Sequence, residues 1–153
     1  MRGPKVNGIA EWCRTGAVLF LLALIAGCGP TGYTRANGSA FGYDERAMGN
    51  DEYAITVTGN PQTSQERVAD IAFLRAAHLA MEQRRTHFAI LNRSSQKFAR
   101  QSAVITPVGV PLITPYNVSH AILLIRLLPN DQPYPPDSVD AAKVIAEVGP
   151  RLK

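Results

Sequence analysis

The feature that most constrains the fold is an alternating segment near the end of the chain, residues 117–128. Its even-numbered positions mix the polar His120 and Arg126 with the apolar Ile122 and Leu124. Its odd-numbered positions from 121 onward are all apolar: Ala121, Leu123, Ile125 and Leu127. Successive side chains of a strand point to opposite faces, so the pattern predicts a strand with one buried face. We expect that face to meet helices and the mixed face to be partly exposed.

Two segments have the apolar spacing of amphipathic helices. The first, residues 64–85, follows Thr63 and contains Glu66, a spacing that predicts a capping box at its start. The second begins near residue 137 and ends at Gly149. The apolar stripes are Val68, Ile71, Ala72 and Leu79 in the first segment, and Ala141, Val144, Ile145 and Val148 in the second.

Three shorter segments, residues 53–58, 87–91 and 102–106, have the composition of strands. Residues 92–101 are polar and basic, and we expect them to form a turn. Residues 107–115 contain three prolines and a glycine. This argues against a central strand, because proline cannot donate a hydrogen bond to a neighbouring strand.

The order of these elements predicts an α+β domain over residues 51–153. We expect two layers: a small sheet of about four strands, with the long helix and the C-terminal helix on one face. Residues 28–50 are rich in glycine and small polar residues, which predicts a flexible tether. The aromatic side chains of this segment would lie at a lipid interface or fold back on the domain.

The first 27 residues have the pattern of a secretory signal peptide. Three cations precede a ten-residue apolar run, Ala17–Ala26, which is half of the ~20 residues that a spanning helix needs. Small residues and then Cys28 follow this run. The alternatives are an uncleaved anchor helix and an ordinary signal peptide with a cysteine there by chance.

The residues Ile25-Ala26-Gly27-Cys28 resemble a bacterial lipobox. The resemblance implies cleavage between Gly27 and Cys28, a diacylglyceryl thioether on Cys28 and acylation of the new amino group. Two or three acyl chains anchor a protein firmly in a membrane, whereas one chain is marginal. Gly29 is not an aspartate, and by resemblance to enterobacterial sorting this favours a lipid-anchored protein of the outer membrane, facing the periplasm.

Composition limits the remaining functions. The chain has sixteen Lys and Arg and twelve Asp and Glu, and residues 1–27 hold three of these cations and one acid. The thirteen cations and eleven acids that remain are nearly balanced, so we expect no nucleic-acid partner. With Cys13 removed and Cys28 lipidated, no cysteine would be left to form a disulfide.

The segment FGYDERAMGNDEYAITVTGNPQTSQERVADIAFLRAAHLAM resembles a group of uncharacterised Gram-negative envelope lipoproteins. That group has a Gly-Tyr-containing leader, a strand ending in Gly-Asn, and a Thr-started helix with Arg-Ala-Ala-Glu. The glutamate of the group is His78 here, so a charge-dependent role of that position would be absent. The resemblance implies no activity, cofactor or site. The matching positions are Gly42, Tyr43, Tyr53, Ile55, Val57, Gly59, Asn60, Thr63, Val68, Leu74, Arg75, Ala76 and Ala77.

Arg75, His78 and Glu82 form a candidate polar site, because spacings of three and four place them on one edge of the predicted helix. Arg75 falls close to the apolar stripe, and a partly buried guanidinium needs an acceptor. The three residues could bind a small anion or handle a proton. The alternative is a structural ion pair of Arg75 with Glu82 or a bond to a backbone carbonyl.

The sequence contains no catalytic or metal-binding motif. His78, His87 and His120 are scattered, with neither a His-Glu-x-x-His motif nor a cysteine pair. A Gly-x-Ser-x-Gly elbow is absent, and Ser119 and His120 would point to opposite faces of a strand. We therefore expect no catalytic residues, no metal and no cofactor.

Two surfaces are candidates for binding. Five cations at the end of the long helix and in the turn that follows it could meet phosphate-bearing envelope polymers or anionic headgroups, or could be a solvated face. The apolar run within residues 107–115 could dock a partner protein or cover the sheet edge. The basic residues are Arg84, Arg85, Arg93, Lys97 and Arg100, and the candidate partner surface is Val108, Val110, Leu112 and Ile113.

Together these features predict a membrane-anchored, non-enzymatic binding or scaffolding accessory protein of the cell envelope. Its expected contacts are the membrane through Cys28, and an envelope protein or wall polymer. The alternative is a small-ligand carrier or envelope enzyme that uses Arg75, His78 and Glu82.

Overall fold

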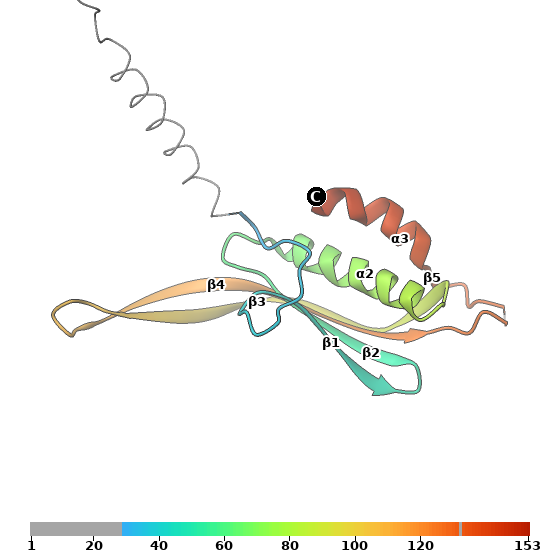
Figure 1. Ribbon diagram of the computed structural model, residues 1–153, viewed down its shortest axis with the longest axis horizontal. Helices are drawn as coiled ribbons and strands as arrows, with labels where there is room; N and C mark the ends of the chain where they lie inside the picture. Colours follow the sequence, from blue (N-terminus) through green and yellow to red (C-terminus); the bar gives the residue numbers. More distant parts are fainter. Residues whose placement is uncertain (1–28, 132) are drawn as a thin grey trace, which may run out of the picture.

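The structure, a computed structural model, describes residues 29–131 and 133–153. The predicted signal peptide, its cleavage site and Cys28 lie outside the described residues. Within the described part, one antiparallel sheet of five strands, in the order β1-β2-β4-β3-β5, carries two helices (Figure 1). The predicted α+β class is confirmed, with five strands where about four were expected. The elements are β1 (Gly42–Gly49), β2 (Glu52–Thr58), α2 (Gln65–Glu82), β3 (His87–Ile105), β4 (Pro111–Leu127), β5 (Val139–Asp140), α3 (Ala141–Val148) and the 3-10 helix η1 (Gly149–Leu152).

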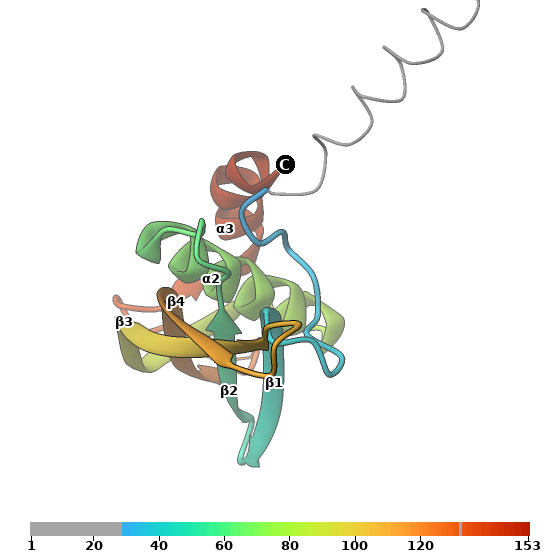
Figure 2. The same ribbon diagram turned by 90° about the vertical axis from the view of Figure 1, so that its left-hand side faces the viewer.

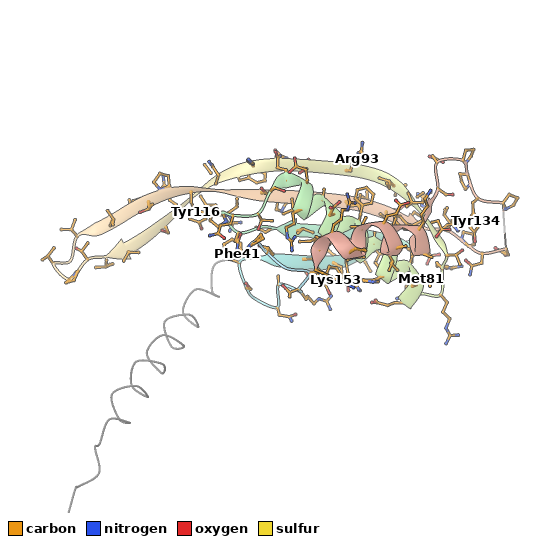
Figure 3. All side chains as sticks on the ribbon, turned by 90° about the horizontal axis from the view of Figure 1, so that it is seen from above. Phe41, Met81, Arg93, Tyr116, Tyr134 and Lys153 are labelled. Atoms are coloured by element: carbon orange, nitrogen blue, oxygen red, sulfur yellow. The ribbon has the colours of Figure 1, made fainter. Side chains whose placement is uncertain are left out.

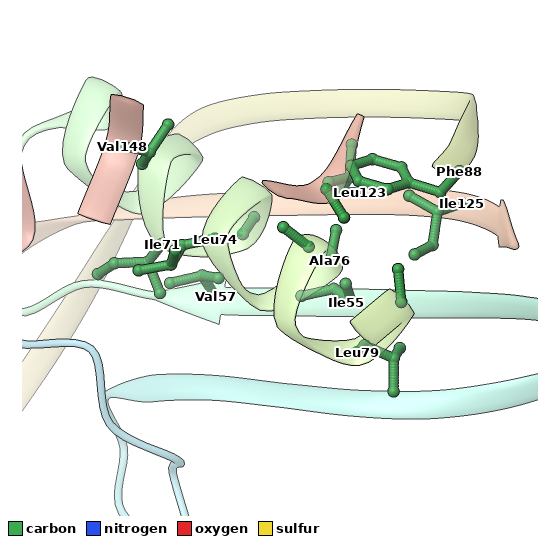
Figure 4. Packing of buried hydrophobic residues seen from close by; sticks show 14 of the residues in the cluster. Ile55, Val57, Ile71, Leu74, Ala76, Leu79, Phe88, Leu123, Ile125 and Val148 are labelled. Atoms are coloured by element: carbon green, nitrogen blue, oxygen red, sulfur yellow. The ribbon is translucent and has the colours of Figure 1, made fainter. Parts of the chain in front are cut away.

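Strand β4 is the centre of the sheet, and its predicted alternation is confirmed. The odd-numbered side chains from Ala121 to Leu127 are buried, whereas Ile122 and Arg126 on the other face are exposed. β2 and β3 both pair with β4 in antiparallel fashion, so they run in the same direction and α2 connects them. Figure 4 shows Leu123 and Ile125 packed together with side chains of α2 and β2 in the core.

Both helices lie on the same side of the sheet. α2 packs against the sheet, and α3 packs mainly against α2 (Figure 2). The predicted apolar stripe of α2 is buried, from Val68 to Leu79. Because α2 is covered on more than one side, several alanines of this helix are buried as well. Small side chains let the helix approach its neighbours closely, which packs the core densely.

The helix cap differs from the predicted capping box. Ser64 is the N-cap residue, and its hydroxyl oxygen accepts from the backbone N–H of Arg67 at 3.1 Å. The Thr63 hydroxyl donates to the Asn60 side chain at 2.7 Å and accepts from the backbone N–H of Thr31 at 2.8 Å. The prediction that Thr63 caps the helix is therefore wrong, because this hydroxyl binds the start of the described chain.

The expected tether over residues 28–50 is wrong for most of its length. Residues Gly42–Gly49 form β1, which pairs with β2 along its length. The two strands are joined by Asn50 and Asp51, which have φ values of 52° and 57°. Positive φ at two consecutive turn residues is the conformation of a tight hairpin turn, and Asn and Asp tolerate it better than most residues.

The beginning of the described chain is also fastened to the domain. The Thr31 hydroxyl accepts from the backbone N–H of Asn60 at 2.8 Å, and the Asn60 side chain donates to the Gly29 carbonyl at 2.8 Å. The Arg67 guanidinium donates to the Thr31 carbonyl at 2.9 Å. Thr31 is buried as a result. A flexible linker of ~20 residues is therefore absent from the described part between Gly29 and the sheet.

Strands β3 and β4 are much longer than the sequence predicted. Residues 92–101, expected as a turn, pair with residues 115–124 of β4, and residues 111–115, in which no central strand was expected, pair with residues 101–105 of β3. The Leu127 N–H bonds to Asp51 on the β2 side, and the Leu128 N–H bonds to His87 on the β3 side. Odd-numbered residues of β4 therefore direct their N–H groups away from β3.

This parity explains why prolines fit in β4. Pro111 and Pro115 are odd-numbered, so the N–H group that each lacks would point away from β3. β2 pairs only with residues 120–126 of β4, so this side of β4 has no neighbouring strand at either proline within the described chain. Proline is tolerated at such an edge position. The prolines therefore exclude a central strand here, as expected, but they do not keep residues 111–115 out of the sheet.

Candidate functional site

The most prominent surface feature is the outer part of the β3–β4 hairpin, residues 99–117, which we call the arm. It consists of the ends of β3 and β4 and the turn between them, and it projects beyond the helices and the other strands (Figures 1 and 3). Every residue of the arm is exposed except Thr106 and Tyr116, which are partly buried. The arm is therefore a two-stranded ribbon outside the core.

The turn at the end of the arm is well defined by its hydrogen bonds. The Thr106 backbone N–H and hydroxyl both donate to the Val110 carbonyl, at 3.0 and 2.9 Å, and the Gly109 N–H donates to the Thr106 carbonyl at 2.8 Å. Pro107 follows Thr106 with a fixed φ, and Gly109 adopts a φ of 78° that other residues rarely adopt. The arm thus presents Val108 on a specified turn, and this side chain is 83% exposed.

Apolar side chains occupy both faces of the arm near its turn. Cross-strand pairs join Val104 with Leu112 and Ala103 with Ile113, and these two successive pairs lie on opposite faces. Leu112 and Ile113 are 58% and 56% exposed. Exposed contiguous apolar surface on a soluble domain marks a binding site or an aggregation hazard. The four residues of the predicted partner surface, Val108, Val110, Leu112 and Ile113, are all exposed in this region.

The five cations of the candidate basic patch are not brought together. Arg84 and Arg85 lie at the C-terminal end of α2, and Arg85 pairs with Asp51 at 3.3 Å. Arg93, Lys97 and Arg100 are spread along β3, where Arg93 and Arg100 are roughly 23 Å apart at ~3.3 Å per residue. The predicted cluster depended on a turn over residues 92–101, and the extended strand found there separates its members.

The candidate polar site is an ion-pair cluster. The Arg75 guanidinium donates two hydrogen bonds of 2.7 Å to the Glu82 carboxylate and a third, through Nε, to Glu45 of β1. Its carbon lies 5.5 Å from the centre of the Tyr43 ring. Arg35 also binds Glu45, at 2.8 Å. All three nitrogens of Arg75 therefore donate to carboxylates, which favours the structural ion pair over an anion-binding site.

The electrostatics of this cluster follow from its geometry. The hydrogen bonds from Arg75 lower the pKa of Glu82, and the two carboxylates raise the pKa of Arg75 against the opposing effect of burial. Burial and the nearby Arg75 charge lower the pKa of His78. Burial raises the pKa of Tyr33, whose hydroxyl lies 2.7 Å from His78 Nδ1. The cluster thus favours a charged Arg75–Glu82 pair beside a neutral His78.

His78 differs from Arg75 and Glu82 because its side chain borders a cavity. The cavity has a volume of about 420 Å³ and lies between α2, the segment before β1 and the C-terminal residues. Tyr33, Leu74, Ile145 and Leu152 also line this cavity, whereas Arg75 and Glu82 do not. The lining is mostly apolar, with His78 and Tyr33 bonded to each other at its margin. The three residues of the candidate site therefore do not line one common pocket.

A second cavity, of about 280 Å³, lies between α2 and the sheet. It is lined by Phe73 and the small residues Ala69 and Ala72 of the helix, and by Arg93 and Ser95 of β3. It lies next to the register shift between Ile90 and Asn92, where β3 is bulged. β-bulges bend a strand locally.

The three histidines lie in different places. His78 lies beside Tyr33, and His87 is stacked on Tyr134 with ring centres 3.7 Å apart. His120 lies edge-on to Phe98, with ring centres 5.5 Å apart. Among the described residues, no group of three metal-ligating side chains is close enough to hold an ion. In the same part of the chain, no helix is both long and apolar enough to cross a membrane.

Sequence reasoning missed Tyr33, Tyr43 and Glu45, which complete the polar cluster. All three were assigned to the tether, although Tyr43 and Glu45 have the period-two spacing of a strand. The signal that could have found β1 is Asn50-Asp51 between two such segments, since residues that tolerate positive φ at this place favour a hairpin.

Comparison of the chain with known protein families, with curated proteins and with solved structures finds no match in any of the three.

Proposed function

We propose that this protein is a lipid-anchored, non-enzymatic binding protein of the bacterial envelope, and that the arm is its binding element. The observation that supports the proposal most strongly is the exposure of apolar side chains on both faces of the arm. An isolated two-stranded ribbon is marginally stable in water, so exposed apolar residues there gain little for folding. Contact with another surface would remove these apolar side chains from water.

The state of the polar cluster also favours binding by the arm over chemistry at Arg75. A guanidinium that donates to two carboxylates has little capacity left for a substrate anion. The Arg75–Glu82 pair joins two turns of α2, and Glu45 joins that pair to β1. This arrangement fits a role in holding the edge of the sheet to the helix.

The anchor part of the proposal has a direct test. Changing Cys28 to Ala removes the sulfur on which the proposed lipid is placed. We expect the protein to move from the detergent-soluble membrane fraction to a soluble or uncleaved pool, and to lose incorporation of a labelled fatty acid. Fatty-acid label that persists in Cys28→Ala would refute Cys28 as the site of lipid attachment.

The binding part is tested by site-specific photo-crosslinking in cells. A photoreactive amino acid at Val108 should give a discrete crosslinked product, whether with a protein or with lipid. The matched control is Met48, which is 55% exposed and belongs to the other hairpin of the sheet. Equal crosslinking at both positions, or none at Val108, would contradict the assignment of the arm as the binding element.

A further inference from the structure

We propose that the arm inserts its turn into the surface of an anionic phospholipid bilayer. This inference rests on the proposed function of the arm as the binding element, and it names the class of partner. Four properties of the described residues support it: apolar side chains on both faces, cations without acids, prolines at the strand edge, and the place where the described chain begins.

Apolar side chains lie on both faces of the arm, and lipid would cover both faces at once. The pairs Val104–Leu112 and Ala103–Ile113 place apolar groups on opposite faces, and Val108 extends from the turn. A flat protein surface would cover only one of these faces. At ~3.3 Å per residue, the part from Ala103 to the turn is about 16 Å long. With the arm inclined to the bilayer, this length reaches from the headgroups into the upper acyl chains, short of the middle of the ~30 Å hydrocarbon layer.

The charged and aromatic residues lie where headgroups would be. No acidic residue occurs between Glu82 and Asp131, so the whole β3–β4 hairpin carries positive formal charges only. Arg100 pairs with Tyr116 across the arm, about 25 Å from the turn at ~3.3 Å per residue. Aromatic rings and cations are favoured at the headgroup level of an anionic membrane.

The prolines reduce the cost of placing a strand edge near lipid. Backbone N–H groups without partners are costly in hydrocarbon. Of the four β4 positions in the arm that direct this group away from β3, two are Pro111 and Pro115, which have no N–H. The same prolines block strand addition by a second copy along this edge. The outward groups that remain favour shallow insertion among headgroups and upper acyl chains over a deep one.

The start of the described chain lies at the end of the body from which the arm projects. Figures 1 and 3 show this from two directions. The Gly29 carbonyl is bonded to Asn60, so the residue after the proposed lipid attachment is held against the domain. A lipid on Cys28 would therefore keep the domain close to the bilayer, with the arm at the same end of the molecule.

The experiment uses the lipidated protein, purified from membranes and reconstituted in vesicles, with tryptophan as the probe. The single tryptophan of the sequence, Trp12, lies in the predicted signal peptide, so an introduced tryptophan is the only one left after the proposed cleavage. Val108→Trp should show a blue-shifted emission in vesicles that contain phosphatidylglycerol. It should also be quenched by lipid brominated near the headgroup end of its acyl chains, more than by lipid brominated deeper.

Met48→Trp is the matched control and should show neither effect. Val110→Trp is a second probe of the arm, in case Val108→Trp disturbs the turn. Far-ultraviolet circular dichroism checks that each variant is folded. If neither arm probe is quenched more than Met48→Trp, the lipid inference is overturned.

The electrostatic part is tested by removing single cations. Arg100→Gln should lower the ratio of inserted to free arm by roughly fivefold, since a cation near an anionic surface contributes that much to partitioning. Arg93→Gln is the control, because Arg93 lies about 50 Å along β3 from the turn and screening extends only ~10 Å at 0.1 M salt. Equal effects of the two variants would contradict the proposed depth of insertion.

The two proposals fail in different ways. Crosslinking of Val108 to one protein, without quenching by brominated lipid, would overturn lipid insertion and leave the arm as a binding element. Neither crosslinking nor quenching at Val108 would overturn both.

Discussion

The same two strands, β3 and β4, behave in opposite ways along their length. In the body of the domain, α2 covers one face of these strands, and Phe88, Leu123 and Ile125 are fully or almost fully buried. In the arm, the strands continue with the same pairing, but Val104 and Leu112 are more than half exposed. Strand pairing alone therefore does not need a core beneath it, and the apolar residues of the arm are not explained by folding.

The body and the arm also differ in whether their cations form ion pairs. In the body, Arg75 and Arg126 form ion pairs with glutamates. Among the described residues, none of the ion pairs includes Arg93, Lys97 or Arg100 of the hairpin. Paired charges hold elements of the body together, whereas the cations near the arm are available to an external anionic surface.

The largest expected difference between body and arm comes from two phenylalanines on one strand. Phe88 is fully buried in the core, and Phe98 is 42% exposed near the base of the arm. Phe88→Ala should lower the free energy of unfolding by about 3–5 kcal/mol, because it removes a large buried side chain and leaves a cavity. Phe98→Ala should cost about 1 kcal/mol, for partial burial and its contact with His120. Urea denaturation of both variants measures the difference, and equal losses would show that the cooperative core extends along β3 as far as the base of the arm.

A smaller difference is expected between two arginines. Arg75→Ala leaves Glu45 and Glu82 without their shared partner in a partly buried place, and should cost about 2–3 kcal/mol. Arg126→Ala removes an exposed pair with Glu52 on the open face of the sheet and should cost about 0–1 kcal/mol. Thermal unfolding of the two variants compares them directly. If Arg75→Ala lowers the free energy of unfolding only slightly, the cluster has a role other than stability.

Much of the body could be predicted from the sequence. The alternation in residues 121–127 and the apolar stripes of both helices appear in the sequence because each has one buried face. The Arg75–Glu82 pair was also within reach, since residues seven apart lie on one face of a helix. Its second carboxylate, Glu45, was not, because that contact depends on where β1 lies in the sheet.

The edge strand and the arm could not be predicted for a physical reason. β1 lies at the edge of the sheet, with most of its residues exposed or only partly buried, so selection for burial leaves a weak pattern. The arm has no buried face, and its polar and apolar residues need no period at all. The length of the arm is set by pairing between residues that are not adjacent in the sequence. Proline is tolerated there because β4 has a free edge within the described chain, and the sequence does not show which strands are neighbours.

The polar cluster of the body should make stability depend on pH, and the arm should not. The pKa of His78 is lowered by burial and Arg75, so the folded protein favours the neutral form. The stability that this contributes is present above the ordinary pKa near 6.5 and is lost as pH falls through the folded value. The lowered pKa of Glu82 has the same sign at lower pH, below about 4.5.

Unfolding by urea at pH 7 and pH 5 tests the histidine effect. The wild-type protein should be less stable at pH 5, and His78→Gln should reduce that loss. His120, whose pKa is also lowered by burial and by Arg100, would account for the remainder. An unchanged pH dependence in His78→Gln would assign the effect to His120 or to the carboxylates.

The smallest effect on stability is expected from the residues with the largest expected effect on binding. Leu112 and Ile113 are more than half exposed, so replacing both with Ser removes little buried surface and should change the free energy of unfolding by less than about 0.5 kcal/mol. The same double variant should abolish the crosslink from Val108 and the quenching of Val108→Trp by brominated lipid, because a polar turn gains nothing from an apolar environment. A large loss of stability would instead place these side chains against the body or a second copy in solution. Serine disfavours strands less than glycine or proline does, so the pairing of β3 and β4 should survive. The double variant therefore separates the contribution of the arm to folding from its contribution to binding.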